Sequence, residues 1–485
     1  MASSDELHYL NAHEQAALIA RKEISPVDLV QSSLSRIEAS DEVLRAWISV
    51  EPERALDAAR KAEAEIMGGN YRGPLHGLPY GVKDQLHAVG FLTTLGTRVL
   101  DEDEMVAPEN ATIIDKLDAA GAILLGKQNL HEFGKGGTID FPYGTPRNPW
   151  HPAYTASSSS SGSGIAPAAG HCSFSIGEDT GGSVRGPASC NGVVGLRPTF
   201  GRVSRAGGVM HAYTADTFGP LARTVRDTAS ILGAISGVDP RDPLSEDRPV
   251  PDYLDGIERG VKGLRLGVVK EIASPDLMDA DVSAGFAAAL DVLAKAGAEI
   301  EEVSLPLAKW AVPLMFLSSD ADVGAYFLKN YLRDRYERFD RGTRTRLAAS
   351  SLIPAGIYNR AMRARVLVRR QILDATERFD ALLSPANVTA PKLIDAVAER
   401  TSDNKEEMIA RHIERRISHY PFSLANVPAL AVPMGYSGEG LPLSLQIAAK
   451  PFAEAMTFRV GRAYERATEW HTRHPMLEQT LKQAI

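Results

Sequence analysis

Short apolar runs that alternate with helical segments constrain the fold of this chain most. The helical segments and the runs that follow them are 112–120 with 122–125, 224–232 with 264–269, and 281–296 with 299–305. Gly121 and Gly297 end two of these helices, because glycine readily adopts the backbone conformation that terminates a helix. Helices that alternate with short buried strands predict an α/β fold, with a mixed β-sheet sandwiched between α-helices.

Both ends of the chain fit the same interpretation. Residues 25–65 are expected to be helical, since Ser25 can cap a helix, Pro26 suits its first turn and Asp28 stands at the third position. The apolar runs 379–383, 429–432 and 443–447 are expected to be further strands.

The composition of the chain is that of a globular enzyme-sized protein. Of its 485 residues, 44% are hydrophobic and 24% are charged, which suffices for a large core. The sequence shows neither a repeat nor a long linker, so we expect one domain over 1–485. Within it, a helical segment at about 1–65 would pack on a core at about 70–235, with a variable and C-terminal part at about 260–485.

Charge and cysteine content exclude several classes of function. The net charge is -8 and no block of five or six basic residues occurs, so we expect no direct nucleic-acid or membrane partner. The arginines between 360 and 370 are expected to form a solvated helix face. No basic leader or apolar run of about 18 residues is visible, which favours a cytoplasmic protein. Two cysteines, Cys172 and Cys190, argue against a disulfide scaffold or a multi-cysteine metal site.

One glycine-rich stretch, from Gly177 to Ser189, carries the strongest chemical signal. Ser183 follows Gly181 and Gly182, so successive backbone N–H groups can face one substrate oxygen beside a serine hydroxyl. A nucleophile and an oxyanion hole can therefore arise from one turn.

The serine needs a proton acceptor, and two upstream segments offer one. Ser157 to Ser161 form a run of five serines, and Lys83 follows the apolar segment 78–82. We interpret these segments and Ser183 as parts of one active site. Burial beside hydroxyl groups favours the uncharged form of a lysine amine, which can act as a base.

These segments, in this order, resemble the amidase signature family, whose members cleave carboxamides with a Ser–Ser–Lys triad. The resemblance covers nearly the whole chain. Besides the three segments above, it rests on 24–30, 74–79, 192–199, Asp216 with Gly219 and Pro220, 426–429, 440–442, and 445–446. It implies the amidase signature fold and hydrolysis without a metal or organic cofactor.

The resemblance also implies a role for each site residue. Ser183 would be the nucleophile, Lys83 the base and Ser159 the relay serine, with Ser160 and Ser158 as alternatives. The peptide bond leading into the relay serine would be cis. The family usually has two glycines before this serine, where the chain has Ser157 and Ser158.

The oxyanion hole implied by the resemblance consists of the backbone N–H groups of Thr180, Gly181, Gly182 and Ser183. Asp179 and Arg185 would support this turn, and larger side chains at the two glycines would block the substrate. Glu178 stands where the family more often has threonine or serine.

Simpler interpretations remain for each residue. Lys83 could pair with Asp84 in a structural ion pair, although a catalytic lysine requires Asp84 to point away and bind backbone. Ser183 could cap a helix. A serine–histidine triad is possible among 12 histidines, but His76 and His171, the nearest to the motifs, are expected to be core or surface residues.

The sequence therefore predicts an amidohydrolase that forms an acyl-enzyme on Ser183. Trp310, Pro313, Met315 and Phe316, together with the loop 133–138, suggest a pocket for a hydrophobic or aryl amide, although core packing explains them equally well. The alternatives are a glutaminase-type A subunit of glutamyl-tRNA amidotransferase and a non-catalytic binding protein on an amidase scaffold. A homodimer is compatible with the sequence.

Overall fold

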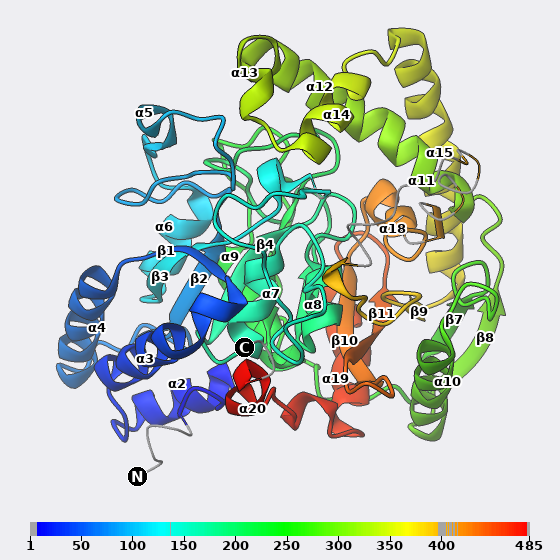
Figure 1. Ribbon diagram of the computed structural model, residues 1–485. Coiled ribbons are helices and arrows are strands. Elements are labelled where there is room, and N and C mark those ends of the chain that lie inside the picture. The colour runs from blue at the N-terminus through cyan, green and yellow to red at the C-terminus, as the bar shows by residue number, and fades with distance from the viewer. Residues whose placement is uncertain are drawn as a thin grey trace.

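One mixed β-sheet crosses the molecule from side to side (Figure 1). The computed structural model describes residues 7–135, 137–395, 404, 406, 410, 413–414 and 416–482. Within them the sheet has eleven strands in the order β1-β3-β2-β4-β6-β5-β10-β11-β9-β7-β8. The strands are β1 (Trp47–Val50), β2 (Pro79–Lys83), β3 (Ile123–Gln128), β4 (Phe174–Glu178), β5 (Val194–Arg197), β6 (Phe218–Ala222), β7 (Arg265–Val269), β8 (Glu299–Val303), β9 (Ala381–Pro385), β10 (Ala429–Tyr436) and β11 (Pro442–Ala448).

The strand directions confirm the predicted mixed sheet. Strand β2 runs parallel to β3 and β4, and β7 runs parallel to β8 and β9. The remaining neighbours, from β4 through β6, β5, β10 and β11 to β9, are antiparallel, as are β1 and β3. A parallel pair brings the carboxyl ends of its strands to the same edge of the sheet. The parallel group β3-β2-β4 carries the site described below.

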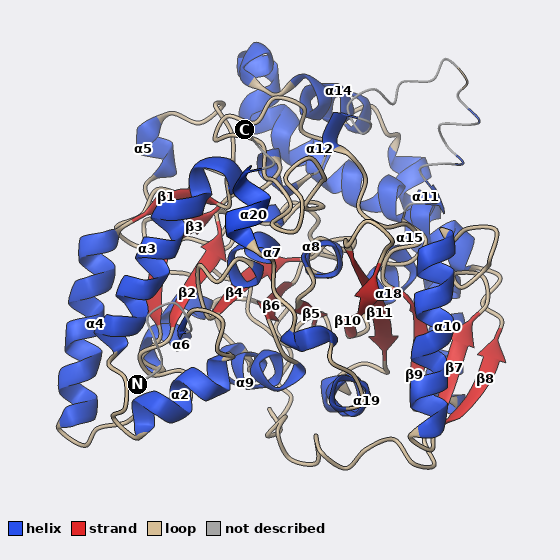
Figure 2. Ribbon diagram, turned by 60° about the horizontal axis from the view of Figure 1, so that its bottom comes forward, coloured by secondary structure: helices blue, strands red, loops and turns tan. Residues whose placement is uncertain are grey.

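Helices cover both faces of this sheet, which confirms the predicted α/β sandwich. Figure 2 shows α7 and α8 on one side of the central strands and α9 and α19 on the other. The α-helices are α2 (Ala12–Ala20), α3 (Pro26–Leu44), α4 (Pro52–Met67), α5 (Glu102–Met105), α6 (Thr112–Ala119), α7 (Ser161–Ala168), α8 (Arg185–Asn191), α9 (Val225–Ile235), α10 (Ala280–Lys295), α11 (Ala311–Met315), α12 (Ala321–Phe327), α13 (Arg333–Arg335), α14 (Arg341–Ser350), α15 (Ala355–Arg378), α18 (Tyr420–Ala425), α19 (Glu454–Arg466) and α20 (Leu477–Lys482). Short 3-10 or π-helical segments are η1 (Glu132–Gly134), η2 (Ala308–Trp310), η3 (Phe316–Asp320), η4 (Leu328–Leu332), η5 (Tyr336–Arg338) and η6 (Trp470–Thr472).

The predicted helix boundaries hold where capping chemistry marked them. Ser25 accepts a hydrogen bond from the Val27 N–H, and Asp28 completes the capping box at the start of α3. Gly121 has a positive φ of 79° just after α6, as expected for a residue that ends a helix. Strand β1 was not predicted, and it divides the N-terminal segment into α3 and α4.

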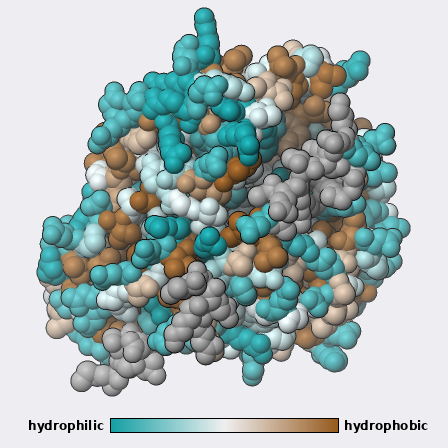
Figure 3. Space-filling model, viewed as in Figure 1, coloured by the Kyte–Doolittle hydropathy of each residue, from teal (hydrophilic) through white to brown (hydrophobic). Residues whose placement is uncertain are grey.

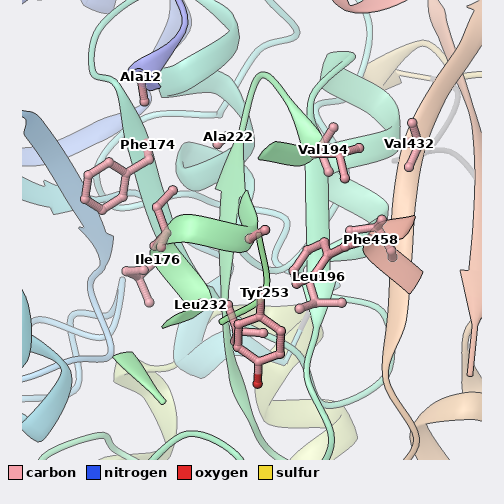
Figure 4. Packing of buried hydrophobic residues seen from close by; sticks show 14 of the residues in the cluster. Ala12, Phe174, Ile176, Val194, Leu196, Ala222, Leu232, Tyr253, Val432 and Phe458 are labelled. Atoms are coloured by element: carbon pink, nitrogen blue, oxygen red, sulfur yellow. The ribbon is translucent and has the colours of Figure 1, made fainter. Parts of the chain in front are cut away.

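The largest hydrophobic core lies against the central strands. Phe174 and Ile176 of β4, Leu196 of β5 and Phe458 of α19 are all fully buried in it (Figure 4). Tyr80 of β2 stacks on Phe174, with ring centroids 5.2 Å apart. This apolar layer fixes the strands that hold the site residues at their ends.

The surface is mixed, and one surface prediction is wrong. On the face in Figure 3, hydrophilic and hydrophobic residues are interspersed. Arg365 of α15 is buried rather than solvated, and its guanidinium donates to the carbonyls of Thr214 and Leu424, while Arg360 and Arg363 are exposed. Among the described residues, no helix combines the length and apolar character needed to cross a membrane.

Candidate active site

Two titratable side chains meet at one edge of the sheet. Lys83 is the last residue of β2 and Glu178 the last residue of β4, and these strands run parallel. The Lys83 Nζ lies 2.8 Å from the Glu178 Oε2, and both side chains are buried. The site therefore begins with a desolvated amine and a desolvated carboxyl group in contact.

The serine run places one hydroxyl against this amine. The Ser159 Oγ lies 2.8 Å from the Lys83 Nζ, and the peptide bond between Ser158 and Ser159 is cis. The Ser160 hydroxyl is engaged elsewhere, because it donates to the Glu178 carbonyl and accepts from the Glu178 N–H. Among the three candidate relay serines, Ser159 is the one in hydrogen-bond contact with Lys83.

Ser183 lies beside the serine run through the backbone. Its carbonyl accepts a hydrogen bond of 3.3 Å from the Ser160 N–H, so the starts of α7 and α8 are adjacent. Ser183 is half-buried, and no side chain within the described residues hydrogen-bonds its hydroxyl. Helix α8 begins at Arg185 with Val184 as its N-cap, so the interpretation of Ser183 as a helix cap is wrong.

The backbone N–H groups of this turn differ in availability. The Gly182 N–H donates to the Asp179 Oδ1 at 2.7 Å, so it is engaged within the protein. The N–H groups of Thr180, Gly181 and Ser183 have no hydrogen-bond acceptor in the described part of the chain. Three of the four predicted oxyanion donors are thus free to bind a ligand oxygen.

The two glycines are required by packing within the protein. A Cβ at Gly181 would lie 2.4 Å from the Tyr420 ring, and one at Gly182 would lie 2.6 Å from the His419 ring. Gly182 also has a positive φ of 112°. The sequence analysis expected larger side chains at these two positions to block the substrate. In the structure, larger side chains there would collide with His419 and Tyr420 at the start of α18.

The predicted supports of the turn form a buried charge network. Asp179 accepts hydrogen bonds from the Gly182 and Val184 N–H groups and from the Arg185 guanidinium, and Arg197 also contacts it. Burial alone would raise the pKa of Asp179, but the two guanidinium groups outweigh it and hold this pKa well below its usual range. Asp179 is therefore a charged anchor for the turn 179–183, which carries Ser183.

Asp84 points away from the Lys83 amine, as a catalytic lysine requires. Its carboxylate accepts hydrogen bonds from the Thr94 N–H and hydroxyl and forms an ion pair with Lys127 at 2.7 Å. Sequence reasoning missed both Lys127 and the contact between Lys83 and Glu178. The register of β2 with its two parallel neighbours places both of them, but no local pattern encodes it.

The two histidines nearest to the motifs have partners other than Ser183. His171 is buried among Ser40 and Trp47, and burial lowers its pKa to about 3. His76 is buried next to Glu65. His131 is also buried, and burial lowers the pKa of its ring to about 4. Its backbone N–H donates to the Ser159 carbonyl. No histidine ring hydrogen-bonds the Ser183 hydroxyl within the described residues, nor do three or more His, Cys, Asp or Glu side chains there form a metal-binding group.

The variable segment contributes less apolar lining than expected. Met315 is buried in the core and Trp310 is 53% exposed on the surface, whereas Phe316 packs against Tyr420 with ring centroids 5.7 Å apart. From the loop 133–138, Phe133 is buried among aromatic residues. Gly136 of this loop lies outside the described residues.

A charged cluster lies between this loop and the variable segment. Lys135 and Arg346 both pair with Asp320, at 3.4 and 2.8 Å, and Arg346 also donates to the Lys135 carbonyl. Arg346 lies over the Phe316 ring, 4.9 Å from its centroid. The region near the turn 179–183 therefore combines aromatic and charged groups.

Comparison with known proteins identifies relatives along the whole length. The amidase family profile matches residues 28–458. The A subunit of the glutamyl-tRNA(Gln) amidotransferase of Moorella thermoacetica is 37% identical over 97% of this chain and 99% of its own length. A bacterial aryl acylamidase of the amidase signature family superposes with a TM-score of 0.86 at 27% identity, covering 99% of both chains. The peptide amidase of Stenotrophomonas maltophilia superposes with a TM-score of 0.80 at 30% identity, over 95% of this chain and 97% of its own.

Proposed function

Since this chain belongs to the amidase family and hydrolyses amides, we propose that it cleaves a carboxamide C–N bond through an acyl-enzyme on Ser183. Lys83 acts as the base and Ser159 as the relay between Lys83 and Ser183. The observation that carries this proposal is the 2.8 Å contact between the Lys83 Nζ and the Ser159 Oγ in a buried site next to the Ser183 turn.

The mechanism begins with an uncharged Lys83 amine. This amine accepts the Ser159 proton while Ser159 accepts the proton of Ser183, whose oxygen attacks the carbonyl carbon. The free N–H groups of Thr180, Gly181 and Ser183 stabilise the oxyanion. The tetrahedral intermediate collapses, the amine leaves with a proton from Ser159, and water hydrolyses the acyl-enzyme by the same relay in reverse.

Replacement of the nucleophile tests the proposal directly. We expect Ser183→Ala and Lys83→Ala each to lower turnover by on the order of a thousandfold or more, because nucleophile and base act as one unit. A fluorophosphonate probe should label Ser183 in the wild-type protein and should not label Ser183→Ala.

A matched control is Ser163→Ala. This buried serine lies on α7, and within the described residues its hydroxyl bonds only to the Ile176 carbonyl, so its loss should leave probe labelling intact. Mass spectrometry of the labelled peptide identifies the site. Near-normal turnover by purified Ser183→Ala would end the proposal.

We propose a hydrophobic or aryl amide as the substrate. Phe316 and Tyr420 support this choice, because Tyr420 packs against Gly181 of the nucleophile turn. A panel of amides, ureas, hydrazides and esters should show faster hydrolysis of aryl amides, and Phe316→Ala should raise their KM about tenfold or more. Equal KM changes for aliphatic amides would contradict a role in aryl recognition.

A second candidate function is that of a glutaminase-type A subunit of glutamyl-tRNA amidotransferase. It is favoured by the 37% identity with such a protein over 97% of the chain. Hydrolysis of simple amides by the isolated chain supports a free-standing amidase. Glutaminase activity that appears only with partner proteins supports the second candidate.

A further inference from the structure

Glu178 is the residue of the site that the proposed mechanism does not use. It stands at the end of β4, where the family resemblance leads one to expect a short hydroxyl side chain, and it is 1% exposed. Its Oε2 contacts the Lys83 Nζ and its Oε1 contacts the Thr180 Oγ1, each at 2.8 Å. Both carboxyl oxygens are therefore engaged by groups of the site.

The hydrogen atoms around Thr180 can be counted. The Thr180 hydroxyl has one hydrogen, but its oxygen lies 2.8 Å from the Glu178 Oε1 and 2.7 Å from the Asp216 Oδ1. A hydroxyl can donate to only one of two oxygens. The other contact needs a hydrogen supplied by one of the two carboxyl groups.

The surroundings of Asp216 decide which carboxyl group supplies this hydrogen. The Asp216 Oδ2 accepts the N–H groups of His211 and Ala212, at 2.8 and 2.9 Å, which suits a carboxylate. Glu178 has no backbone donor on its carboxyl group within the described residues. The Thr180 hydroxyl then donates to Asp216 and accepts the hydrogen of Glu178.

We propose that Glu178 is a neutral carboxylic acid that keeps Lys83 an uncharged amine, with the carboxyl proton on the Oε1 facing Thr180. This inference rests on the proposed function of Lys83. In an ion pair, all three protons would be on the Lys83 nitrogen and none on the Glu178 carboxyl group. In the proposed neutral pair, two protons are on the nitrogen and one is on the carboxyl group. One N–H bond is exchanged for one O–H bond, so no proton is lost to solvent and the pair stays neutral.

This arrangement gives each of the three contacts one donor and one acceptor. The Ser159 hydroxyl donates to the Lys83 lone pair, the Lys83 amine donates to the Glu178 Oε2, and Glu178 donates to Thr180. The amine lone pair thus faces the relay hydroxyl from which the mechanism removes a proton. Glu178 acts through Lys83 and is a positioning residue.

The charges around Glu178 are compatible with a neutral acid. Burial raises the pKa of Glu178, the Lys83 charge opposes this rise and the Asp216 charge adds to it. The charged groups that act on Glu178 itself are Lys83, Asp216 and Arg197. The groups that interact with Lys83 or Asp216 are His131, His211, Lys135 and Asp322. In a desolvated pair, two neutral groups avoid the free energy of burying two charges.

Infrared spectroscopy tests the protonation state without relying on activity. The spectrum of the wild-type protein minus that of Glu178→Gln should show the carbonyl band of a protonated carboxylic acid at pH 8. The matched control is Glu465→Gln, which removes a buried carboxyl group on α19 whose pKa burial raises to about 7. The Glu465 band should fade as the pH rises through 7. A carboxylate band in the Glu178 difference spectrum overturns the proposal.

The pH dependence of kcat/KM gives a second test. The glutamine side chain in Glu178→Gln reproduces the hydrogen bonds of the neutral acid, since its oxygen accepts from Lys83 and its amide donates to Thr180. The acid limb of the Glu178→Gln profile should therefore stay within about 0.5 pH unit of the wild-type limb. An ion pair would behave differently. If Glu178 were a carboxylate, its replacement by glutamine would remove a negative charge beside Lys83 and move the acid limb to lower pH by about 1–3 units. A shift of this size would contradict the proposal.

A second variant covers the case in which Glu178→Gln does not fold. Thr180→Ala removes the acceptor of the Glu178 proton, so the acid carbonyl band should shift but persist. Its absence in both the wild type and Thr180→Ala overturns the inference. Failure of the proposed function itself is distinguishable, because it removes fluorophosphonate labelling of the wild type and leaves the infrared result unaffected.

Discussion

At the scale of single residues, Gly182 shows how closely the turn 179–183 is packed. Its φ is 112° and an added Cβ would lie 2.6 Å from the His419 ring. We expect Gly182→Ala to lower the free energy of unfolding by about 2–5 kcal/mol, because backbone strain and a collision add. We also expect turnover to fall with it. Denaturant unfolding and amide hydrolysis measure the two effects.

Gly69→Ala separates backbone strain from collision. Gly69 follows α4 with a φ of 89°, and nothing lies within 4 Å of an added Cβ. Its substitution should lower the unfolding free energy by about 1–2 kcal/mol and leave turnover unchanged. Equal losses of stability in the two variants would show that the His419 ring moves away from the added Cβ without a cost in free energy.

The residue scale also shows what the sequence could predict of the site. Lys83, the serine run and Ser183 were found because each lies in a local pattern of glycines, serines or apolar residues. The partner of Lys83 was not found. Glu178 and Lys83 are 95 positions apart, and only the pairing of β2 with β4 brings them together. The site assignment itself stays a prediction until the variants are measured.

At the scale of elements, the start of α9 joins distant parts of the chain. The Thr224 Oγ1 accepts from the Asp227 N–H, and the Val225 N–H donates to Glu465 of α19. Asp227 in turn accepts from the His13 N–H of α2. Segments from both ends of the described chain are thus fastened to one helix end.

The cap of α9 gives a prediction for stability. Thr224→Ala removes the side-chain acceptor of the Asp227 N–H, and we expect it to lower the unfolding free energy by about 1 kcal/mol. Ser230→Ala is the control on the same helix, since in the described part of the chain the Ser230 hydroxyl bonds only to the Arg226 carbonyl one turn earlier. Thermal unfolding of both variants should show a loss in Thr224→Ala alone. A stable Thr224→Ala would mean that Glu465 and solvent satisfy the helix end.

Helices with clear end signals and strands within apolar runs were predictable, whereas strand β1 was not. Helices α6 and α10 lie within one residue of their expected ranges, and α3 and α9 begin where their caps predicted. Strand β1 has four residues and lies between two helices, so its pairing with β3 decides its structure. The buried Arg365 was mistaken for a surface residue because its acceptors, the carbonyls of Thr214 and Leu424, are remote in sequence.

At the scale of the whole molecule, Glu465 links pH to stability. Burial raises the pKa of Glu465 to about 7 from its ordinary 4.5, so the folded protein binds this proton more tightly than the unfolded chain does. The contribution of Glu465 to the unfolding free energy is therefore complete below pH 4.5 and is lost as the pH rises through about 7. The loss amounts to at most about 3 kcal/mol.

Glu465→Gln should flatten this dependence, because an amide does not titrate. We expect the unfolding free energy of the variant, relative to wild type, to increase between pH 5 and pH 8. Urea unfolding at several pH values measures this difference. A constant difference over the range would show that Glu465 is ionised throughout.

The order of the strands has a consequence for synthesis. Strand β5 lies between β6 and β10, although β10 follows it only near the C-terminal part of the chain. A chain that has not yet been synthesised as far as β10 lacks the strand that pairs with one edge of β5. Unpaired margins of this kind invite wrong association. Coexpression with a chaperone that binds nascent chains should therefore raise the yield of soluble protein. This gain should exceed the gain from refolding the denatured full-length chain more slowly.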